Sequence, residues 1–139
     1  MSIAPDLPSK LERLSKECQR LEAHRQLSLE AFLASPTIQG DTCYLLITTF
    51  RGALDIATAL LDTLWVPQPG DEAGIFAQLA EKEVLSQVCV SQLTAMQGLC
   101  TSIFQQYEEI DPQWVYQTLQ INLDGLNEFV AQVQAHLDR

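Results

Sequence analysis

The chain has 139 residues, 47% of them hydrophobic, and a formal net charge of −10 at pH 7. That length suits one domain over residues 1–139 with a substantial hydrophobic core. No run approaches the roughly 18 uninterrupted apolar residues of a membrane span, and the first residues lack the basic and apolar segments of a signal peptide. We therefore expect a cytoplasmic protein with no membrane partner.

The negative charge is unevenly distributed along the chain. Residues 1–51 carry six basic and six acidic side chains, so the whole excess lies in residues 52–139, where only Lys82 and Arg139 are basic. Such a surface repels phosphates, which disfavours RNA as a partner. Any basic patch would have to come from the first helix and Arg51.

The first half of the chain shows helical periodicity. A first helix is predicted from a start at Asp6 or Ser9 to about Gln26, followed by a short capped turn over residues 28–33. A second long helix is predicted from about Thr37 to Leu64. Additional apolar residues widen its stripe, so we expect it to be central and covered on more than one side; these are Tyr44, Leu45, Ala53 and Leu60.

The second half continues the same pattern after a Pro- and Gly-containing loop. A shorter helix is predicted to end near Glu83, with Ile75 and Leu79 facing inward. The following helix, from about Ser86 to Ile110, has apolar residues in steps of three and four; these are Cys89, Leu93, Met96, Cys100, Ile103 and Tyr107. Asp111 and Pro112 begin a last helix that runs to about Leu137.

No useful stretch alternates with period two, so no sheet is expected. The predicted fold is all-α, an up-and-down four-helix bundle with one extra short helix in a connection. The four cysteines lack the close spacing of a metal or redox site and fall in apolar stripes, so we interpret them as reduced core residues. His24 and His136 are predicted at the surface. No motif indicates a metal or a cofactor.

Two polar residues lie beside the buried surface of the second long helix. Arg51 precedes Asp55 by four residues, which is the spacing of an ion pair on a helix. The simpler interpretation is a solvated or paired edge; the alternative is that both contribute to a functional site.

Two longer segments and one short one resemble a known family. Residues 27–33 and 111–130 are similar to the corresponding parts of HepT-like proteins of the HEPN superfamily, and residues 53–57 resemble the second long helix of that family. The resemblance spans about residues 11–137. It implies an all-α homodimer with two motifs facing each other across a cleft. Typical members are RNase toxins, whose antitoxin, the minimal nucleotidyltransferase MntA, AMPylates the tyrosine of the motif.

The family motif is an arginine, four residues, a histidine, one residue and a tyrosine, and this chain departs from it. The resemblance places Cys100 at the arginine and Gln105 at the histidine, with Thr101 where an asparagine is usual. Only Tyr107 is retained. Arg51 stands where an acidic residue is expected, whereas Asp55 matches. A thiol cannot bind a phosphate by charge, and an amide cannot exchange a proton near neutral pH.

Three hypotheses follow from this comparison. The first is a dimeric interaction module without RNase activity, which binds an MntA-like nucleotidyltransferase and has no catalytic residues. The second is an active RNase toxin with an atypical site, in which Arg51, Gln105 and Tyr107 act and Asp55 orients. The third is a helical scaffold unrelated to HEPN proteins. Tyr107 is either an apolar-stripe residue with its hydroxyl at the rim, or a retained modification or docking site. Its acidic neighbours Glu108 and Glu109 would repel a nucleotide triphosphate, which disfavours AMPylation.

Overall fold

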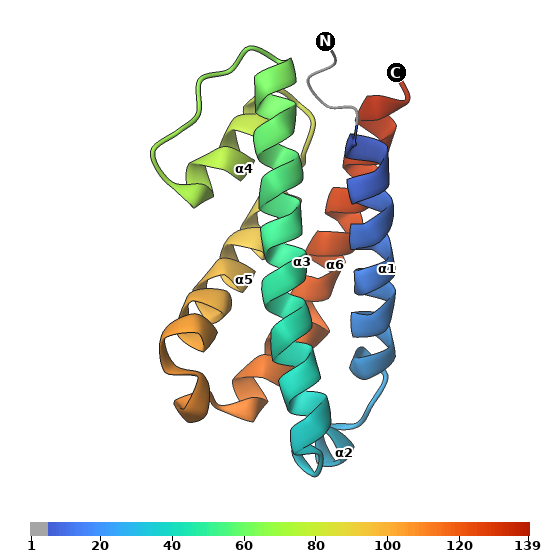
Figure 1. Ribbon diagram of the computed structural model, residues 1–139, viewed down its shortest axis with the longest axis vertical. Helices are drawn as coiled ribbons and strands as arrows, with labels where there is room; N and C mark the ends of the chain where they lie inside the picture. The colour runs from blue at the N-terminus through green and yellow to red at the C-terminus, as the bar shows by residue number, and fades with distance from the viewer. Residues whose placement is uncertain (1–5) are drawn as a thin grey trace.

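The computed structural model describes residues 6–139, and over this range the chain is all-α. Four long helices alternate in direction (Figure 1). Two short helices, rather than the one predicted, lie in connections, and a 3-10 turn follows the third long helix. The elements are α1 (Leu7–Arg25), α2 (Leu29–Leu33), α3 (Pro36–Thr63), α4 (Glu72–Glu81), α5 (Gln87–Gln106), η1 (Tyr107–Glu109) and α6 (Pro112–Leu137).

Side-chain caps fix most of the helix starts. Ser28 accepts a hydrogen bond from the backbone of Ala31, and Asp111 accepts one from Gln113, as the sequence predicts. Ser35 caps α3 in the same way, so this helix begins one residue earlier than predicted. Asp6 precedes α1 without a side-chain hydrogen bond to it.

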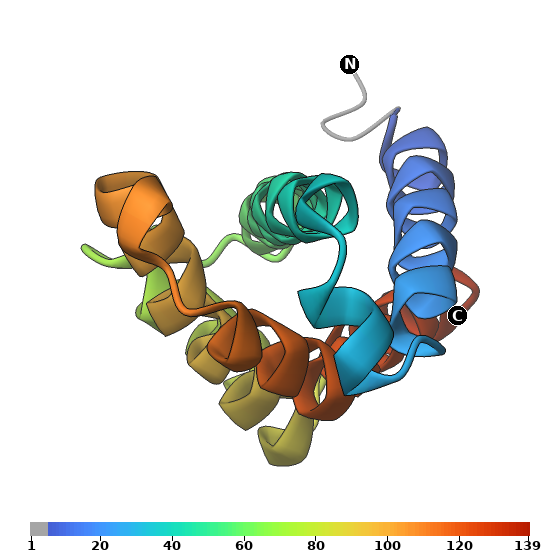
Figure 2. The ribbon, with the colours of Figure 1, turned by 90° about the horizontal axis from the view of Figure 1, so that it is seen from below.

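Helix α3 is the centre of the bundle and contacts α1, α4, α5 and α6. Seen along its axis, it lies in the mouth of a U formed by α1, α6 and α5 (Figure 2). Its covered positions are fully buried, for example Leu45 and Ala53. Tyr44, in contrast, is 61% exposed, so the prediction that it widens the apolar stripe is wrong. The uncovered side of α3 therefore faces solvent between α1 and α5.

The length and composition of α3 are sufficient for a membrane span, with a mean hydropathy of 1.4 over its most apolar window. The fold accounts for this, because 56% of that window is buried against the other helices. An apolar helix covered on several sides belongs to the core.

The four cysteines are buried free thiols, as predicted. Burial raises the pKa of Cys43 to about 11 and those of Cys18, Cys89 and Cys100 to about 12. These groups are neutral at physiological pH and pack as small apolar side chains.

Candidate functional site

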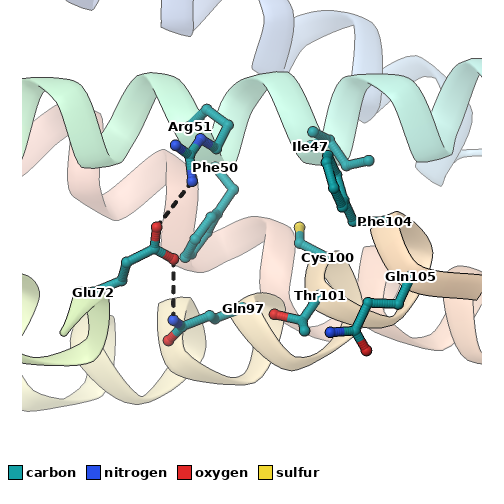
Figure 3. A pocket seen from close by; sticks show the side chains of 9 residues that line it. All are labelled: Ile47, Phe50, Arg51, Glu72, Gln97, Cys100, Thr101, Phe104 and Gln105. Carbon is teal, nitrogen blue, oxygen red and sulfur yellow. Dashed lines mark hydrogen bonds and ion pairs between the residues drawn. The ribbon is translucent and has the colours of Figure 1, made fainter.

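A cavity of about 370 Å³ lies between the uncovered side of α3 and the second half of α5 (Figure 3). Its apolar lining comes from Ile47, Phe50, Cys100 and Phe104, and its polar lining from Arg51, Glu72, Gln97, Thr101 and Gln105. Cys100 and Gln105, the residues that the resemblance assigns to the arginine and histidine positions of the motif, therefore lie in one cavity with Arg51. Its volume is at the lower end of the range for small-molecule sites.

Cys100 forms part of the wall of this cavity nearest the core. Its side chain points toward α3, where Sγ lies 3.5 Å from the carbonyl oxygen of Leu46, and the residue is 9% exposed. Burial is the main cause of its raised pKa, and Cys43 and Glu72 add to it. A protonated thiol at this position offers no positive charge to a phosphate.

Arg51 is the sole cationic side chain lining the cavity among residues 6–139, and it is already paired. Its Nη1 lies 2.9 Å from Oε2 of Glu72, the first residue of α4. The other oxygen of Glu72 accepts a hydrogen bond of 3.3 Å from the amide of Gln97 (Figure 3). The structure thus pairs Arg51 with Glu72 on another helix, and within residues 6–139 the i,i+4 spacing of Arg51 and Asp55 does not produce an ion pair between them.

Gln105 and Thr101 line the cavity on the side of α5 and hold unused hydrogen-bonding groups. Within residues 6–139, neither side chain forms a hydrogen bond to the protein, whereas Thr94 on the same helix donates to the carbonyl of Val90. An amide and a hydroxyl can donate to and accept from a ligand. Neither group can act as a proton-transfer catalyst near neutral pH.

Tyr107 lies outside this cavity. Helix α5 ends at Gln106, so the predicted helix to Ile110 is four residues too long, and Tyr107 begins η1 instead. The side chain is 57% exposed, which contradicts its predicted place in the buried stripe. Its hydroxyl lies over Gly40 of α3, 3.2 Å from the position that a Cβ would take there.

A second cavity of about 380 Å³ adjoins the first on the other side of α3. The two share Ile47 and Arg51, and the second is completed by α1 with Lys10, Arg13 and Glu17 and by Asp55 of α3. The first helix and Arg51, the one place where the sequence allows a basic patch, thus contribute basic side chains to one cavity, together with the acidic Glu17 and Asp55. Asp55 is exposed and faces this second cavity rather than the motif positions.

The sequence did not single out Glu72, Gln97 or Phe104 as site residues. No spacing in the sequence links Glu72 to Arg51, because the two residues lie on different helices. His24 is also less exposed than predicted, because its Nε2 lies 2.7 Å from Asp41 on α3, and this pair links α1 to α3. Neither histidine lines either cavity.

The sequence and the fold are both similar to those of known proteins. The family model described as Ribonuclease HepT-like matches residues 14–133. A tRNA nuclease HepT from Aphanizomenon flos-aquae is 24% identical over 131 residues, which cover 94% of this chain and 89% of that protein. The fold resembles that of the Bacillus subtilis cytosolic protein YutE, with a TM-score of 0.80, 17% identity and coverage of 94% and 90% of the two chains.

A second solved structure with this fold is the tri-AMPylated HEPN toxin of Shewanella oneidensis in complex with its MNT antitoxin. It has a TM-score of 0.76 and 20% identity, and the match covers 97% of this chain and 98% of that one. The family model that matches residues 14–133 contradicts the hypothesis of an unrelated helical scaffold. Because the matching model spans most of the bundle, this chain belongs to the Ribonuclease HepT-like family.

Proposed function

We propose that this protein is a HepT-like module that pairs with a minimal nucleotidyltransferase and does not cleave RNA. The observation that carries the proposal is the composition of the cavity at the motif positions. Cys100 supplies a neutral thiol, Gln105 supplies an amide, and Arg51 is held by Glu72 at 2.9 Å. RNA cleavage by this family's motif needs a free cation and an imidazole at this place.

The chemical reason is the charge that develops during phosphodiester cleavage. A guanidinium stabilises that charge, and a group titrating near neutral pH moves the protons. Loss of a single transition-state contact commonly lowers kcat by about 10²–10³-fold. The two replacements together therefore support a binding role for the cavity.

The uncovered side of α3 is the surface on which a second copy of the chain would bind. We propose that a second copy covers this side, because exposed aromatic side chains gather there from α3 and from the end of α5. Tyr44 is 61%, Phe104 83% and Tyr107 57% exposed. An isologous contact would place the two cavities opposite each other.

Tyr107 is the residue through which the nucleotidyltransferase would act. Its exposure makes the hydroxyl accessible, and a structural relative is AMPylated and bound to an MNT antitoxin. Glu108 and Glu109 repel the triphosphate of an incoming nucleotide, so we propose docking of the partner as the main role of this end of the molecule. Both proteins would act in the cytoplasm.

Affinity purification of the tagged full chain from its native cells, with mass spectrometry of the eluate, tests the partner. A minimal nucleotidyltransferase in the eluate supports the proposal, and its loss in Tyr107→Ala assigns the docking site. Trp65→Ala is the control, since Trp65 is an even more exposed aromatic residue in the connection after α3. Recovery of the tagged chain alone would contradict the partnership.

The runner-up is an RNase in which Arg51 replaces the missing arginine. It is favoured by the position of Arg51 in the same cavity as Gln105 and Cys100. In that case purified protein would cleave RNA, and Arg51→Ala would abolish the cleavage while Lys82→Ala would not. Absence of cleavage above a buffer control, with intact dimer and fold, would refute this second function.

A further inference from the structure

Helix α5 ends at a place where its own sequence gives no reason for an end. Gln106 departs from helical geometry, with φ of −141° and ψ of 48°, whereas Tyr107 returns to it, with φ of −50° and ψ of −44°. Gln106 is therefore the residue that separates α5 from η1. No glycine or proline stands at residues 103–110, so the break is held by contacts with other parts of the fold.

The apolar pattern of α5 continues past this break. Cys100 and Ile103 are buried, and Tyr107 follows them at the steps of three and four residues that keep side chains on one helix face. If α5 continued through Gln106, the Tyr107 side chain would lie on the same face as these buried residues. In the structure it is 57% exposed instead. The two arrangements differ at one residue, and only the observed one presents Tyr107 at the surface.

The contact that distinguishes the observed arrangement is with Gly40 on α3. The end of α5 and the start of α3 lie at the same end of the bundle (Figure 1). The hydroxyl oxygen of Tyr107 lies 3.2 Å from the position that a Cβ of Gly40 would take, which is closer than an ordinary van der Waals contact of 3.4–4 Å. The missing side chain of Gly40 therefore leaves the space that the hydroxyl occupies.

Gly40 has no evident role within α3 itself. It is the fifth residue of a 28-residue helix, where glycine is less favourable than alanine because it loses more backbone freedom on folding. No glycine among residues 6–139 has a positive φ, so the backbone of α3 does not require glycine here. A residue that weakens its own helix without a local benefit is typical of a position that serves a contact with another part of the chain.

We propose that Gly40 is a positioning residue for Tyr107. The space beside Gly40 receives the hydroxyl, and this contact selects the arrangement in which α5 breaks at Gln106 and Tyr107 stays at the surface. Filling that space favours the continuous helix and turns Tyr107 toward the buried face. The positioning itself follows from the geometry of this contact. Its consequence for a partner rests on the docking role proposed above for Tyr107.

NMR of the isotopically labelled full chain tests the positioning without any partner. The Cα chemical shift of Gln106 reports its backbone conformation, and incorporated fluorotyrosine reports the surroundings of Tyr107 through its fluorine shift. Tyr107→Phe identifies this signal among those of the three tyrosines. In the wild-type chain we expect a non-helical Cα shift at Gln106. In Gly40→Leu we expect that shift to move into the helical range, together with a change in the fluorine signal of Tyr107.

Two controls separate this contact from the general effects of replacing a glycine. Gly98→Leu adds the same side chain to α5, where a Cβ meets nothing within 4 Å, and should leave both signals unchanged. Gly40→Ala should act in the same direction as Gly40→Leu but less, because the hydroxyl has to yield by only a few tenths of an ångström. In the Tyr107→Phe background, Gly40→Ala should cause no further change at Gln106, since the atom that the methyl group would meet is absent.

The affinity purification described above measures the consequence for the partner. Gly40→Leu should lower recovery of the nucleotidyltransferase about tenfold or more, as Tyr107→Ala does, whereas Gly98→Leu should change it less than about twofold. If no nucleotidyltransferase is recovered even with the wild-type chain, the docking role fails, and the NMR signals still decide whether Gly40 positions Tyr107.

Three results would overturn the inference. One is a helical Cα shift at Gln106 in the wild-type chain, because α5 would then not be broken there. Another is a Gly40→Leu variant whose signals match those of Gly98→Leu. The third is an equal effect of Gly40→Ala on Gln106 with and without the Tyr107 hydroxyl, and this comparison also decides the question if Gly40→Leu does not fold.

Discussion

Two glycines on neighbouring helices give a sharp test of the packing that supports the site. Gly125 of α6 is buried against Gln92 of α5, and a Cβ there would lie 2.6 Å from the Cβ of Gln92. Gly98 of α5 is exposed, and a Cβ there would meet nothing within 4 Å. Both glycines lie inside helices, where Gly→Ala gains about 0.8–1 kcal/mol of intrinsic helix stability.

We expect Gly98→Ala to raise the free energy of unfolding by about that amount, since nothing opposes it. In Gly125→Ala the same gain is offset by overpacking, which costs about 1–3 kcal/mol when the obstacle cannot rotate away. A Cβ is fixed to the backbone, so α5 and α6 would have to separate. The net effect should lie between neutral and about 2 kcal/mol destabilising.

Urea unfolding followed by circular dichroism measures both variants. Their difference isolates the overpacking, because the helix-propensity gain is common to both, and it should be about 1–3 kcal/mol. Gln92→Gly in the Gly125→Ala background removes the obstructing Cβ, so a double-mutant cycle should show a coupling of similar size. If Gly125→Ala is as stable as Gly98→Ala, the close approach of α5 and α6 is refuted.

Three further variants and conditions probe other parts of the fold by urea unfolding. Burial raises the pKa values of the thiols in the folded state, so their contribution to the free energy of unfolding is complete below the unfolded pKa of about 9. As pH rises from there toward 11–12, the free energy of unfolding should fall by up to about 1.4 kcal/mol per pH unit for each thiol. A free energy of unfolding that stays constant from pH 8 to 10.5 would contradict the burial of the thiols. Glu83→Gly should stabilise the chain by about 1 kcal/mol, because Glu83 has φ of 61° after α4; a loss of stability would show that its side chain holds this turn. Arg51→Ala should cost less than about 1 kcal/mol, since both partners of its ion pair are exposed; a larger loss would give Arg51 a structural role.

Helix positions could be predicted from the sequence because burial imposes a period, but the end of α5 could not. The apolar steps continue through Ile103 to Tyr107, and they predict a helix to Ile110. In the structure Gln106 adopts φ of −141° and ψ of 48°, which breaks the helix one residue before Tyr107. No Gly or Pro marks this position, so the sequence carries no local signal for the break.

The environment of Arg51 shows a second limit of sequence reasoning. Spacing predicts a pair with Asp55 on the same helix, yet the guanidinium contacts Glu72, 21 residues later. Local pairs follow from helical geometry, whereas a contact between helices depends on how α4 packs against α3. The resemblance assigns Cys100 and Gln105 to the motif, and the structure brings both side chains into one cavity.

Binding and cleavage place different demands on a cavity, and our proposal that this one binds without cleaving follows from that difference. Cleavage requires a cation close to the scissile phosphate and a group that exchanges protons there. Cys100 instead completes an apolar wall at 9% exposure, and a guanidinium in its place would be buried without a carboxylate, since Glu72 already holds Arg51. Lys10 and Arg13 of α1, which form no ion pair within residues 6–139, line the neighbouring cavity, where they can attract a phosphate but have no histidine beside them to exchange protons. Restoring the motif with Cys100→Arg and Gln105→His alone would therefore place a buried charge without creating its partner.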